Sequence, residues 1–495
     1  MKEISVIGAG IAGLTAALRL QYDGYHVTIY EKGPRVGGKM NQIKAKGYTF
    51  DLGPTIVMMH DIYKENLAYT NVNPEDYIEF KQLDPMYQVT FSDGETIHAH
   101  NDLPRLIEDL EKRSYKTASE YLDYLNHTYK KYLVAKEHFI ERSFRKPSDF
   151  YNLKTLRQAL KLKTFDSAHH TISKFVKDEK IQNMLSFQTL YIGISPKKGP
   201  SIYTIIPMIE TLYGVSYAKG GMYSYAKALE KRFLELGGVI KTNETVEEIL
   251  FENKTAYGIR SNGKIIKSDL VICNADFPWA MNHLVKDSKV KGKYTEKKIS
   301  KMAYSCSVMI LYIGLNKKVK ELNVHNLYFG SDFDQNLKEI FTGHLPSDPA
   351  FYIYSPSQID ESVAPVGKEN LYVLVPVPEL KTSELSWDES VTNQYKEKIF
   401  DKLEKIKGLE DIRTQIDYLE IMTPNRFSDE LNAMYGATFG LAPTLFQSNY
   451  YRPKNVYPYA KNLYFAGSSV HPGAGVPIAI TSGKLVHQEV KKDFE

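Results

Sequence analysis

Residues 4–20 read ISVIGAGIAGLTAALRL, and this stretch decides the fold. A short apolar run rich in β-branched residues ends at Gly8, and small and apolar residues with helical spacing follow it. The glycines form a G-x-G-x-x-G motif at the expected strand-to-helix turn. In this motif Gly8 allows a tight turn, Gly10 lets a pyrophosphate approach the backbone, and Gly13 lets the helix pack close to the strand.

Free N–H groups at the start of that helix would bind the anion, and the helix dipole favours the same charge. The stretch therefore predicts a dinucleotide-binding turn. The alternative is a glycine-rich turn in an unrelated α/β fold. The predicted site around the turn also includes Val6, Ala9, Ile11 and Ala12.

A second strand, HVTIYEK at 26–32, supports the dinucleotide interpretation. Glu31 lies 23 positions after Gly8, where a βαβ unit places the acceptor for an adenosine ribose hydroxyl. A glutamate at this strand end, rather than an arginine, favours a ribose without a 2′-phosphate. We include the adjacent Lys32 in the predicted site.

The next residues carry a resemblance to a known group of proteins. After Glu31 comes KGPRVGGKMNQ, in which Gly37 and Gly38 form a second glycine turn before Lys39. The combined pattern resembles that of the flavoprotein oxidoreductases that include amine oxidases and phytoene desaturases, and it implies FAD as the cofactor. DLGPT at 51–55 is similar to the loop beside the flavin ring in that group. The resemblance thus implies cofactor contacts from Gly53, Pro54 and Thr55, and from the backbone of Val246.

A third glycine cluster lies near the C-terminus, in LYFAGSSVHPGAGVPIAITSG at 463–483. We expect a strand that ends at Gly467 beside the N-terminal strand, in the same parallel sheet. Gly475 and Pro477 would then lead into a helix that begins near Ile478, with Val476 in the turn. The N–H groups and dipole of that helix would face the flavin as its charge grows on reduction. The alternative is a plain strand-to-helix turn that needs glycine for a positive φ.

Size and composition exclude several classes. A chain of 495 residues with 43% hydrophobic content has room for two or three domains, and a net charge of +4 does not indicate a nucleic-acid partner. Only Cys273 and Cys306 are present, so we expect no disulfide framework. Met1 is followed at once by a strand pattern, and no run of about 18 apolar residues occurs. We expect a cytoplasmic protein that can lie on a membrane but does not span it.

The order of patterns predicts an α/β protein with a Rossmann-type FAD-binding domain, a second mixed-sheet substrate domain and an inserted helical region. The FAD domain is expected to be discontinuous. Its three parts are 1–100, 216–290 and 451–495; the helical region is 101–215 and the substrate domain is 291–450. Asn262-Gly263 between two β-rich runs predicts a hairpin.

The helical region is strongly basic over residues 130–163, which hold ten Lys or Arg against three acids. Aromatic residues are interleaved with them: Tyr132, Phe139, Phe144, Phe150 and Tyr151. Such a segment could hold an anionic membrane surface, and we expect it to contact the inner face of the cell membrane peripherally. An ordinary solvated helical face is the alternative.

Longer segments narrow the resemblance. FQTLYIGISPKKGPSIYTIIPMIETLYGVSYAKGGMY at 187–223, GLAPTLFQSNYYRPKN at 440–455 and the C-terminal cluster resemble bacterial carotenoid desaturases of the phytoene type. Within that family they look most like the branch that acts on the C30 polyene 4,4′-diapophytoene. The resemblance implies hydride transfer to flavin N5 with proton loss, forming 4,4′-diaponeurosporene. The alternatives are a C30 terminal-methyl oxidase, a C40 phytoene desaturase and a prenyl-lipid carrier of the GDP-dissociation-inhibitor type.

The residues do not identify catalytic groups. The sequence shows no Ser-His-Asp arrangement, no metal-ligand cluster and no convincing carboxylate pair, so we name no metal and no catalytic residue. Glu210 is a weak candidate for a general base. The apolar segment 201–218 could line a substrate tunnel, or it could be a buried helix broken at Pro207. We expect His471 to be a structural loop residue and the pair His169-His170 to lie on the surface. The oligomeric state, the number of steps and the electron acceptor stay open.

Overall fold

The computed structural model describes residues 2–162, 165–383 and 385–495. A five-stranded parallel sheet joins three distant parts of the chain, in the order β10-β2-β1-β14-β20. Its strands are β1 (Glu3–Ile7), β2 (His26–Tyr30), β10 (Val239–Lys241), β14 (Leu270–Cys273) and β20 (Leu463–Phe465). β20 pairs with β14, so the expectation that the C-terminal strand lies directly beside the N-terminal strand was wrong; both belong to one sheet.

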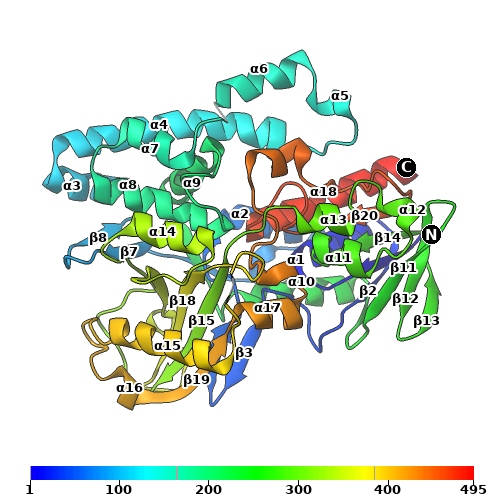
Figure 1. Cartoon of the computed structure of the whole chain (residues 1–495). Coiled ribbons are helices and arrows are strands. Elements are labelled where there is room, and N and C mark those ends of the chain that lie inside the picture. Colours follow the sequence, from blue (N-terminus) through cyan, green and yellow to red (C-terminus); the bar gives the residue numbers. More distant parts are fainter. Residues whose placement is uncertain (1, 163–164, 384) are drawn as a thin grey trace.

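Helices cover this sheet. α1 (Ile11–Tyr22) packs between α10 (Tyr223–Glu235) and α18 (Val476–Phe494), and α2 (His60–Ala68) packs against α18. Gly13 permits the close approach of helix and strand, since a Cβ there would lie 2.5 Å from the Gly8 carbonyl oxygen. The first and last helices of the chain thus lie side by side beneath the helical region (Figure 1).

Smaller sheets flank the parallel one. β11 (Val246–Glu252), β12 (Thr255–Ser261) and β13 (Lys264–Lys267) form an antiparallel sheet. The predicted hairpin at Asn262-Gly263 is confirmed, and both residues have positive φ, as this turn requires. The other short strands are β3 (Gln42–Ala45) with β4 (Tyr48–Asp51), and β5 (Val57–Met58), β9 (Val215–Ala218) and β6 (Phe80–Gln82). Short helices follow β14: α11 (Phe277–His283), α12 (Ser288–Lys291) and α13 (Glu296–Ser300).

A seven-stranded mixed sheet forms the second lobe, in the order β19-β15-β18-β17-β16-β7-β8. Its strands are β7 (Tyr87–Thr90), β8 (Thr96–Ala99), β15 (Ser307–Leu315), β16 (His325–Tyr328), β17 (Phe351–Tyr354), β18 (Glu369–Val377) and β19 (Ile416–Met422). β7 pairs with β16, so the sheet draws residues 87–99 away from the expected 1–100 unit. α15 (Glu389–Leu403) packs on one face; α14 (Phe333–Thr342), α16 (Ile412–Gln415) and α17 (Pro424–Leu431) complete the lobe.

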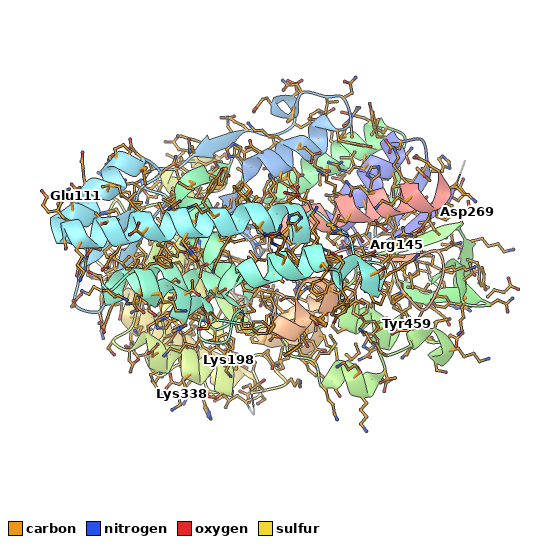
Figure 2. All side chains as sticks on the ribbon, turned by 90° about the horizontal axis from the view of Figure 1, so that it is seen from above. Glu111, Arg145, Lys198, Asp269, Lys338 and Tyr459 are labelled. Carbon is orange, nitrogen blue, oxygen red and sulfur yellow. The ribbon has the colours of Figure 1, made fainter. Side chains whose placement is uncertain are left out.

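The helical region lies over both lobes at the top of Figure 1. Its helices are α3 (Leu103–Arg113), α4 (Tyr115–Ala135), α5 (Pro147–Phe150), α6 (Leu153–Leu162), α7 (Ala168–Phe175), α8 (Glu179–Ser186) and α9 (Ile205–Tyr213), with short helical turns η2 (Lys136–Ile140), η3 (Phe187–Ile192) and η4 (Ser201–Thr204). Viewed from above, α4 crosses the molecule and Arg145 lies by α18 (Figure 2), where its guanidinium pairs with Glu489.

Two expectations about the helical region need correction. Pro207 does not break a helix, because it lies in the first turn of α9, where a proline is tolerated. Of the five interleaved aromatic residues, Tyr132, Phe139 and Phe144 are buried. Phe139 and Phe144 pack with Leu162 in a small core cluster. The basic segment extended to Lys163, which lies outside the described residues.

Candidate active site

A cavity of about 700 Å³ is lined by residues of both lobes. At one end it is lined by the glycine turns of the parallel-sheet lobe, and at the other by apolar residues of the seven-stranded sheet and η3. Predicted residues that line it are Gly8, Gly10, Ile11, Ala12, Glu31, Lys32, Gly37, Gly38, Lys39, Gly53, Pro54, Thr55, Val246, Gly467, Gly475, Val476 and Pro477. The lining does not include Val6, Ala9, Gly13 or Ile478.

The N-terminal turn has the geometry of a pyrophosphate cradle. Gly8 has φ +90°, and a Cβ on Gly10 would lie 2.6 Å from the Asn274 Oδ1. Gly10 is also the N-cap of α1, and no described side chain caps that end. The N–H groups of the first turn are therefore left to a ligand, because the first four N–H groups of a helix have no partner within it.

Glu31 ties the end of β2 to this turn. Its Oε2 accepts a hydrogen bond from the Ala9 N–H at 2.8 Å, and its Oε1 accepts one from the Gly33 N–H at 2.8 Å. The carboxylate lines the cavity, and each oxygen has a second lone pair for a ribose hydroxyl. Glu31 therefore lies directly beside the glycine turn, as the sequence predicted.

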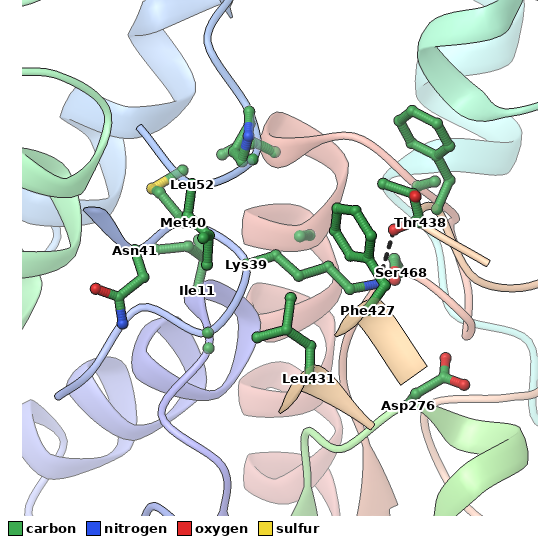
Figure 3. Close-up of a pocket in the computed structure, with 18 of the residues that line it drawn as sticks. Ile11, Lys39, Met40, Asn41, Leu52, Asp276, Phe427, Leu431, Thr438 and Ser468 are labelled. Atoms are coloured by element: carbon green, nitrogen blue, oxygen red, sulfur yellow. Dashed lines mark hydrogen bonds between the residues drawn. The ribbon is translucent and has the colours of Figure 1, made fainter. Parts of the chain in front are cut away.

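The second glycine turn packs directly on the first. The Gly37 N–H donates to the Ala9 carbonyl at 2.8 Å, and both Gly37 and Gly38 have positive φ. Lys39 then extends into the cavity, and its Nζ donates to the Thr438 carbonyl at 2.7 Å (Figure 3). Burial lowers the pKa of Lys39, and the charge of Asp276 opposes that shift.

The C-terminal cluster presents a second uncapped helix end. Gly475, with φ +107°, is the N-cap of α18, and no described side chain caps it. The helix begins at Val476, two residues before the expected start. Because Gly467, Gly475 and Pro477 all line the cavity, two helix N-termini face the same space.

Asn274 and Asp276, which follow β14, were not among the predicted residues. The Asn274 amide donates to the Ala466 carbonyl at 2.9 Å and closes over Gly10, while Asp276 accepts from the Ser469 hydroxyl. The strand pattern DLVIC at 269–273 could have pointed to them, because parallel strands end at a common edge of the sheet and β14 is the neighbour of β1. The polar residues that directly follow such a strand are therefore candidates for the cofactor site.

One face of the seven-stranded sheet forms an apolar arm of the cavity. Alternate residues of β15 and β18 point into it, and β17 and β16 continue the floor. The floor consists of Cys306, Val308, Ile310, Tyr372, Leu374, Pro376, Tyr352 and Leu327. Four strands about 4.8 Å apart make a floor roughly 14 Å wide. Phe187, Leu190 and Tyr191 of η3 lie on the other side.

Comparisons with known proteins agree with this architecture. A family model described as flavin containing amine oxidoreductase matches residues 11–491. The chain belongs to the flavin-containing amine oxidoreductase family. Its cofactor is FAD, and it is an oxidoreductase. The uncapped helix ends and the close glycine turns fit a dinucleotide of this kind.

Curated relatives cover the whole chain. A 4,4′-diapophytoene desaturase (4,4′-diaponeurosporene-forming) of Staphylococcus haemolyticus (strain JCSC1435) is 46% identical over 496 residues, covering 99% of this chain and 99% of that protein. The protein of the same name from Staphylococcus aureus (strain Newman) is 48% identical over 498 residues, covering 100% of this chain and 99% of its own.

Solved structures share the fold. An oxidoreductase from Methanosarcina mazei has a TM-score of 0.64 at 19% identity, covering 98% of this chain and 100% of that chain. A CLA-producing fatty acid isomerase from P. acnes has a TM-score of 0.61 at 13% identity, covering 100% of this chain and 99% of that chain. At these identities the likeness concerns the fold alone.

The other candidate residues singled out in the sequence do not line the cavity of this flavoprotein. Residues 201–218, all described, do not line it. Glu210 is buried, and burial raises its pKa to about 8. His471 is buried with Nε2 2.8 Å from the Arg142 carbonyl oxygen, as a structural loop residue would be. In the pair, His170 is exposed and His169 is half-buried.

Proposed function

We propose that this chain is an FAD-dependent desaturase that converts 4,4′-diapophytoene to 4,4′-diaponeurosporene. Full-length identity of 46–48% to relatives with that activity carries the proposal. An apolar arm that continues directly from the glycine turns supports it, because an uncharged polyene needs burial rather than a cationic clamp.

The cofactor supplies the difficult chemistry, which is acceptance of a hydride, and the chain supplies binding, orientation and a dry site. Under this proposal the start of α1 and Gly37-Gly38 hold the pyrophosphate, and Glu31 accepts from the adenosine ribose. Val246 lies against the adenine, while residues 53–55 and the start of α18 hold the flavin end. The floor residues Val308, Ile310 and Leu374 would lie along the polyene.

Product analysis tests the proposal. Purified protein with FAD is incubated separately with 4,4′-diapophytoene, with C40 phytoene and with 4,4′-diaponeurosporene. We expect the first substrate to yield products with red-shifted polyene bands and no added oxygen. Preference for phytoene would favour the C40 alternative. Oxygenated product from 4,4′-diaponeurosporene, with no reaction of 4,4′-diapophytoene, would establish a terminal-methyl oxidase instead.

We further propose that the protein contacts the inner face of the cell membrane through one exposed surface. No helix in the described part of the chain is long and apolar enough to cross a bilayer. An exposed apolar and aromatic group surrounds the start of α6, with Tyr151 and Tyr451 hydroxyls 2.9 Å apart and Phe446 against Tyr451. Leu153 is 88% and Phe446 73% exposed. Lys154 and Arg157 flank them, a combination that suits an anionic lipid surface.

Cosedimentation with phosphatidylglycerol vesicles tests this surface. The double variant Leu153→Asp with Phe446→Asp should bind several-fold less, because it removes apolar insertion and adds negative charge. Val366→Asp is the control, since Val366 is also an exposed apolar residue but lies in the second lobe. Equal binding by the double variant and the control would contradict the proposed surface.

A further inference from the structure

The apolar arm of the cavity ends at one edge of its floor. Two rows of side chains cross the floor strands by their register, and all of these side chains line the cavity. One row is Ile310, Leu374, Tyr352 and Leu327, and the other is Val308, Pro376, Ala350 and Phe329. The next positions in the two rows are Val89 and Phe91. Neither lines the cavity, nor does any residue of β7 or β8, all of which are described. The arm therefore stops at Phe329.

The opposite ends of the two rows lie toward the cofactor. β15 begins just after Ser305, whose N–H donates to the Gly440 carbonyl at 3.0 Å. Gly440 follows Thr438, whose carbonyl binds the Lys39 ammonium. Val308 on β15 and the closed end of its row are three strand spacings apart, which is about 14 Å across the sheet. The arm thus has a cofactor end and a closed end.

Three phenylalanine rings close the far end of the arm, and we call them the end wall: Phe187 of η3, Phe329 after β16 and Phe333 at the start of α14. Phe329 packs edge-to-face against Phe187, with ring centroids 5.9 Å apart, and against Phe333, with centroids 4.7 Å apart. All three rings line the cavity and are buried. Because edge-to-face contacts between aromatic rings are favourable, each ring helps to hold the others in place.

The end wall is backed by protein. Phe91 stacks behind Phe329 at 5.3 Å, with 23° between the ring planes, and is itself buried. The Phe329 N–H donates to the Thr90 carbonyl at 2.9 Å, which fixes the backbone at this point to β7. Protein interiors are close-packed, so these rings cannot retreat from the arm without displacing their neighbours. The end wall therefore gives the arm a fixed length.

An arm of fixed length can select an apolar chain by its length. The reacting carbons of a polyene must lie at the flavin, and the rest of that half of the chain must fit into the arm. C40 phytoene has one more isoprene unit at each end than 4,4′-diapophytoene. A hydrocarbon has no polar group to recognise, so a protein must discriminate between the two by the space that it offers.

We propose that the end wall, formed by Phe187, Phe329 and Phe333, sets the chain length of the substrate and makes the C30 polyene preferred over its C40 homologue. The inference rests on the proposed function. With its reacting carbons at the flavin, the additional isoprene unit of a C40 chain would overlap the three rings. The longer chain would have to displace a ring or leave its reacting carbons away from the flavin, and either outcome slows its reaction.

Shortening one wall residue tests the proposal. The FAD-loaded proteins are incubated with an equimolar mixture of 4,4′-diapophytoene and C40 phytoene, and both products are quantified. In Phe333→Ala the ratio of kcat/KM for the C40 chain to kcat/KM for the C30 chain should rise at least tenfold, because one methylene group in an apolar pocket already changes selection about tenfold or more. Phe333→Leu should give a smaller rise, and it serves the same test if the alanine variant does not fold.

Phe400→Ala is the matched control. Phe400 is also a buried phenylalanine of the second lobe, but it packs in the core on the other face of the seven-stranded sheet and does not line the cavity. Its variant should keep the wild-type ratio of the two kcat/KM values. Ala350→Leu is the reciprocal variant, because it adds bulk in the row beside Phe329. It should lower kcat/KM for 4,4′-diapophytoene and leave the FAD content per chain unchanged.

The outcomes distinguish the end wall from the proposed function. A wild-type protein that converts 4,4′-diapophytoene without preferring it to phytoene would overturn the end wall. The same holds if both Phe333 variants keep the wild-type ratio, or if Phe400→Ala changes the ratio as much as Phe333→Ala does. Failure of the FAD-loaded wild-type protein to convert either polyene would instead overturn the proposed function.

Discussion

The Lys39 Nζ donates a hydrogen bond to the Thr438 carbonyl at 2.7 Å, across 399 residues of sequence. The contact joins the second glycine turn to the segment after α17, on opposite sides of the cavity. Asp276 is half-buried near the ammonium, and desolvation raises its pKa while the charge of Lys39 opposes that rise. Lys39, which the sequence placed in the cofactor site because it follows Gly37-Gly38, thus connects the two lobes at the cofactor end of the cavity.

Replacing this lysine should weaken the cofactor site. In Lys39→Met the cation and the interlobe hydrogen bond are lost, and Asp276 loses the larger of the two positive charges that act on it. We expect a higher Kd for FAD, measured by flavin fluorescence on titration of the apoprotein. Lys381→Met is the control, because its Nζ also donates to a carbonyl, that of Met302 at 2.9 Å, but away from the cavity. Equal Kd values for the two variants would contradict a role for Lys39.

The C-terminal turn should be sensitive to a side chain. Gly475 has φ +107°, which is unfavourable for other residues, and it caps the helix end that faces the cavity. Gly475→Val should lower FAD content per chain and slow flavin reduction. Gly367→Val is the matched control, because Gly367 has φ +77° and a Cβ added there would meet no heavy atom within 4 Å. If both variants retained flavin and turnover equally, the turn would have no special role.

Filling the apolar arm should separate substrate binding from cofactor binding. Leu374 lies on the cavity face of β18, and Leu374→Trp would occupy space assigned to the polyene. We expect normal FAD content with at least a tenfold loss of kcat/KM for 4,4′-diapophytoene, about the effect of 1.4 kcal/mol. Val366→Trp, at an exposed position, should leave both the FAD content and kcat/KM unchanged. Wild-type kcat/KM in Leu374→Trp would place the substrate elsewhere.

Glu210 should make the fold less stable as pH rises. Its folded pKa of about 8 lies above the ordinary 4.5, because burial disfavours the carboxylate. The folded chain therefore binds this proton more tightly than the unfolded chain. The resulting stability is fully present below pH 4.5 and is lost as pH rises through 8, at about 1.4 kcal/mol per unit at most.

Glu210→Gln removes that titration and can still accept from the Gln188 amide, which bonds Glu210 in the wild type. Between about pH 6 and about pH 9 the Tm of the wild type should fall relative to the Tm of the variant, because only the wild type carries the titrating carboxyl. Burial also raises the pKa of Asp51, to about 7. Because Asp51 is present in both proteins, its contribution to the pH dependence cancels in the Tm difference. A pH-independent difference would show that Glu210 does not titrate in this range.

The sequence predicted the cofactor end better than the substrate end. Glycine positions follow from backbone geometry: Gly8 and Gly475 have the positive φ that their turns require. The apolar arm depends instead on which strands share a sheet, and β7 joins β16 through pairing that local patterns do not contain. For segment 201–218 the sequence left a tunnel wall and a buried helix open, because the two have similar composition. The segment contributes to the core and does not line the cavity.

Anaerobic mixing of the FAD-loaded protein with 4,4′-diapophytoene tests the central claim most directly. We predict bleaching of the flavin band, with about one new C=C bond formed per FAD reduced and no oxygen in the product. Persistence of the oxidised flavin spectrum with unchanged substrate, under conditions in which the protein holds FAD, would contradict that claim.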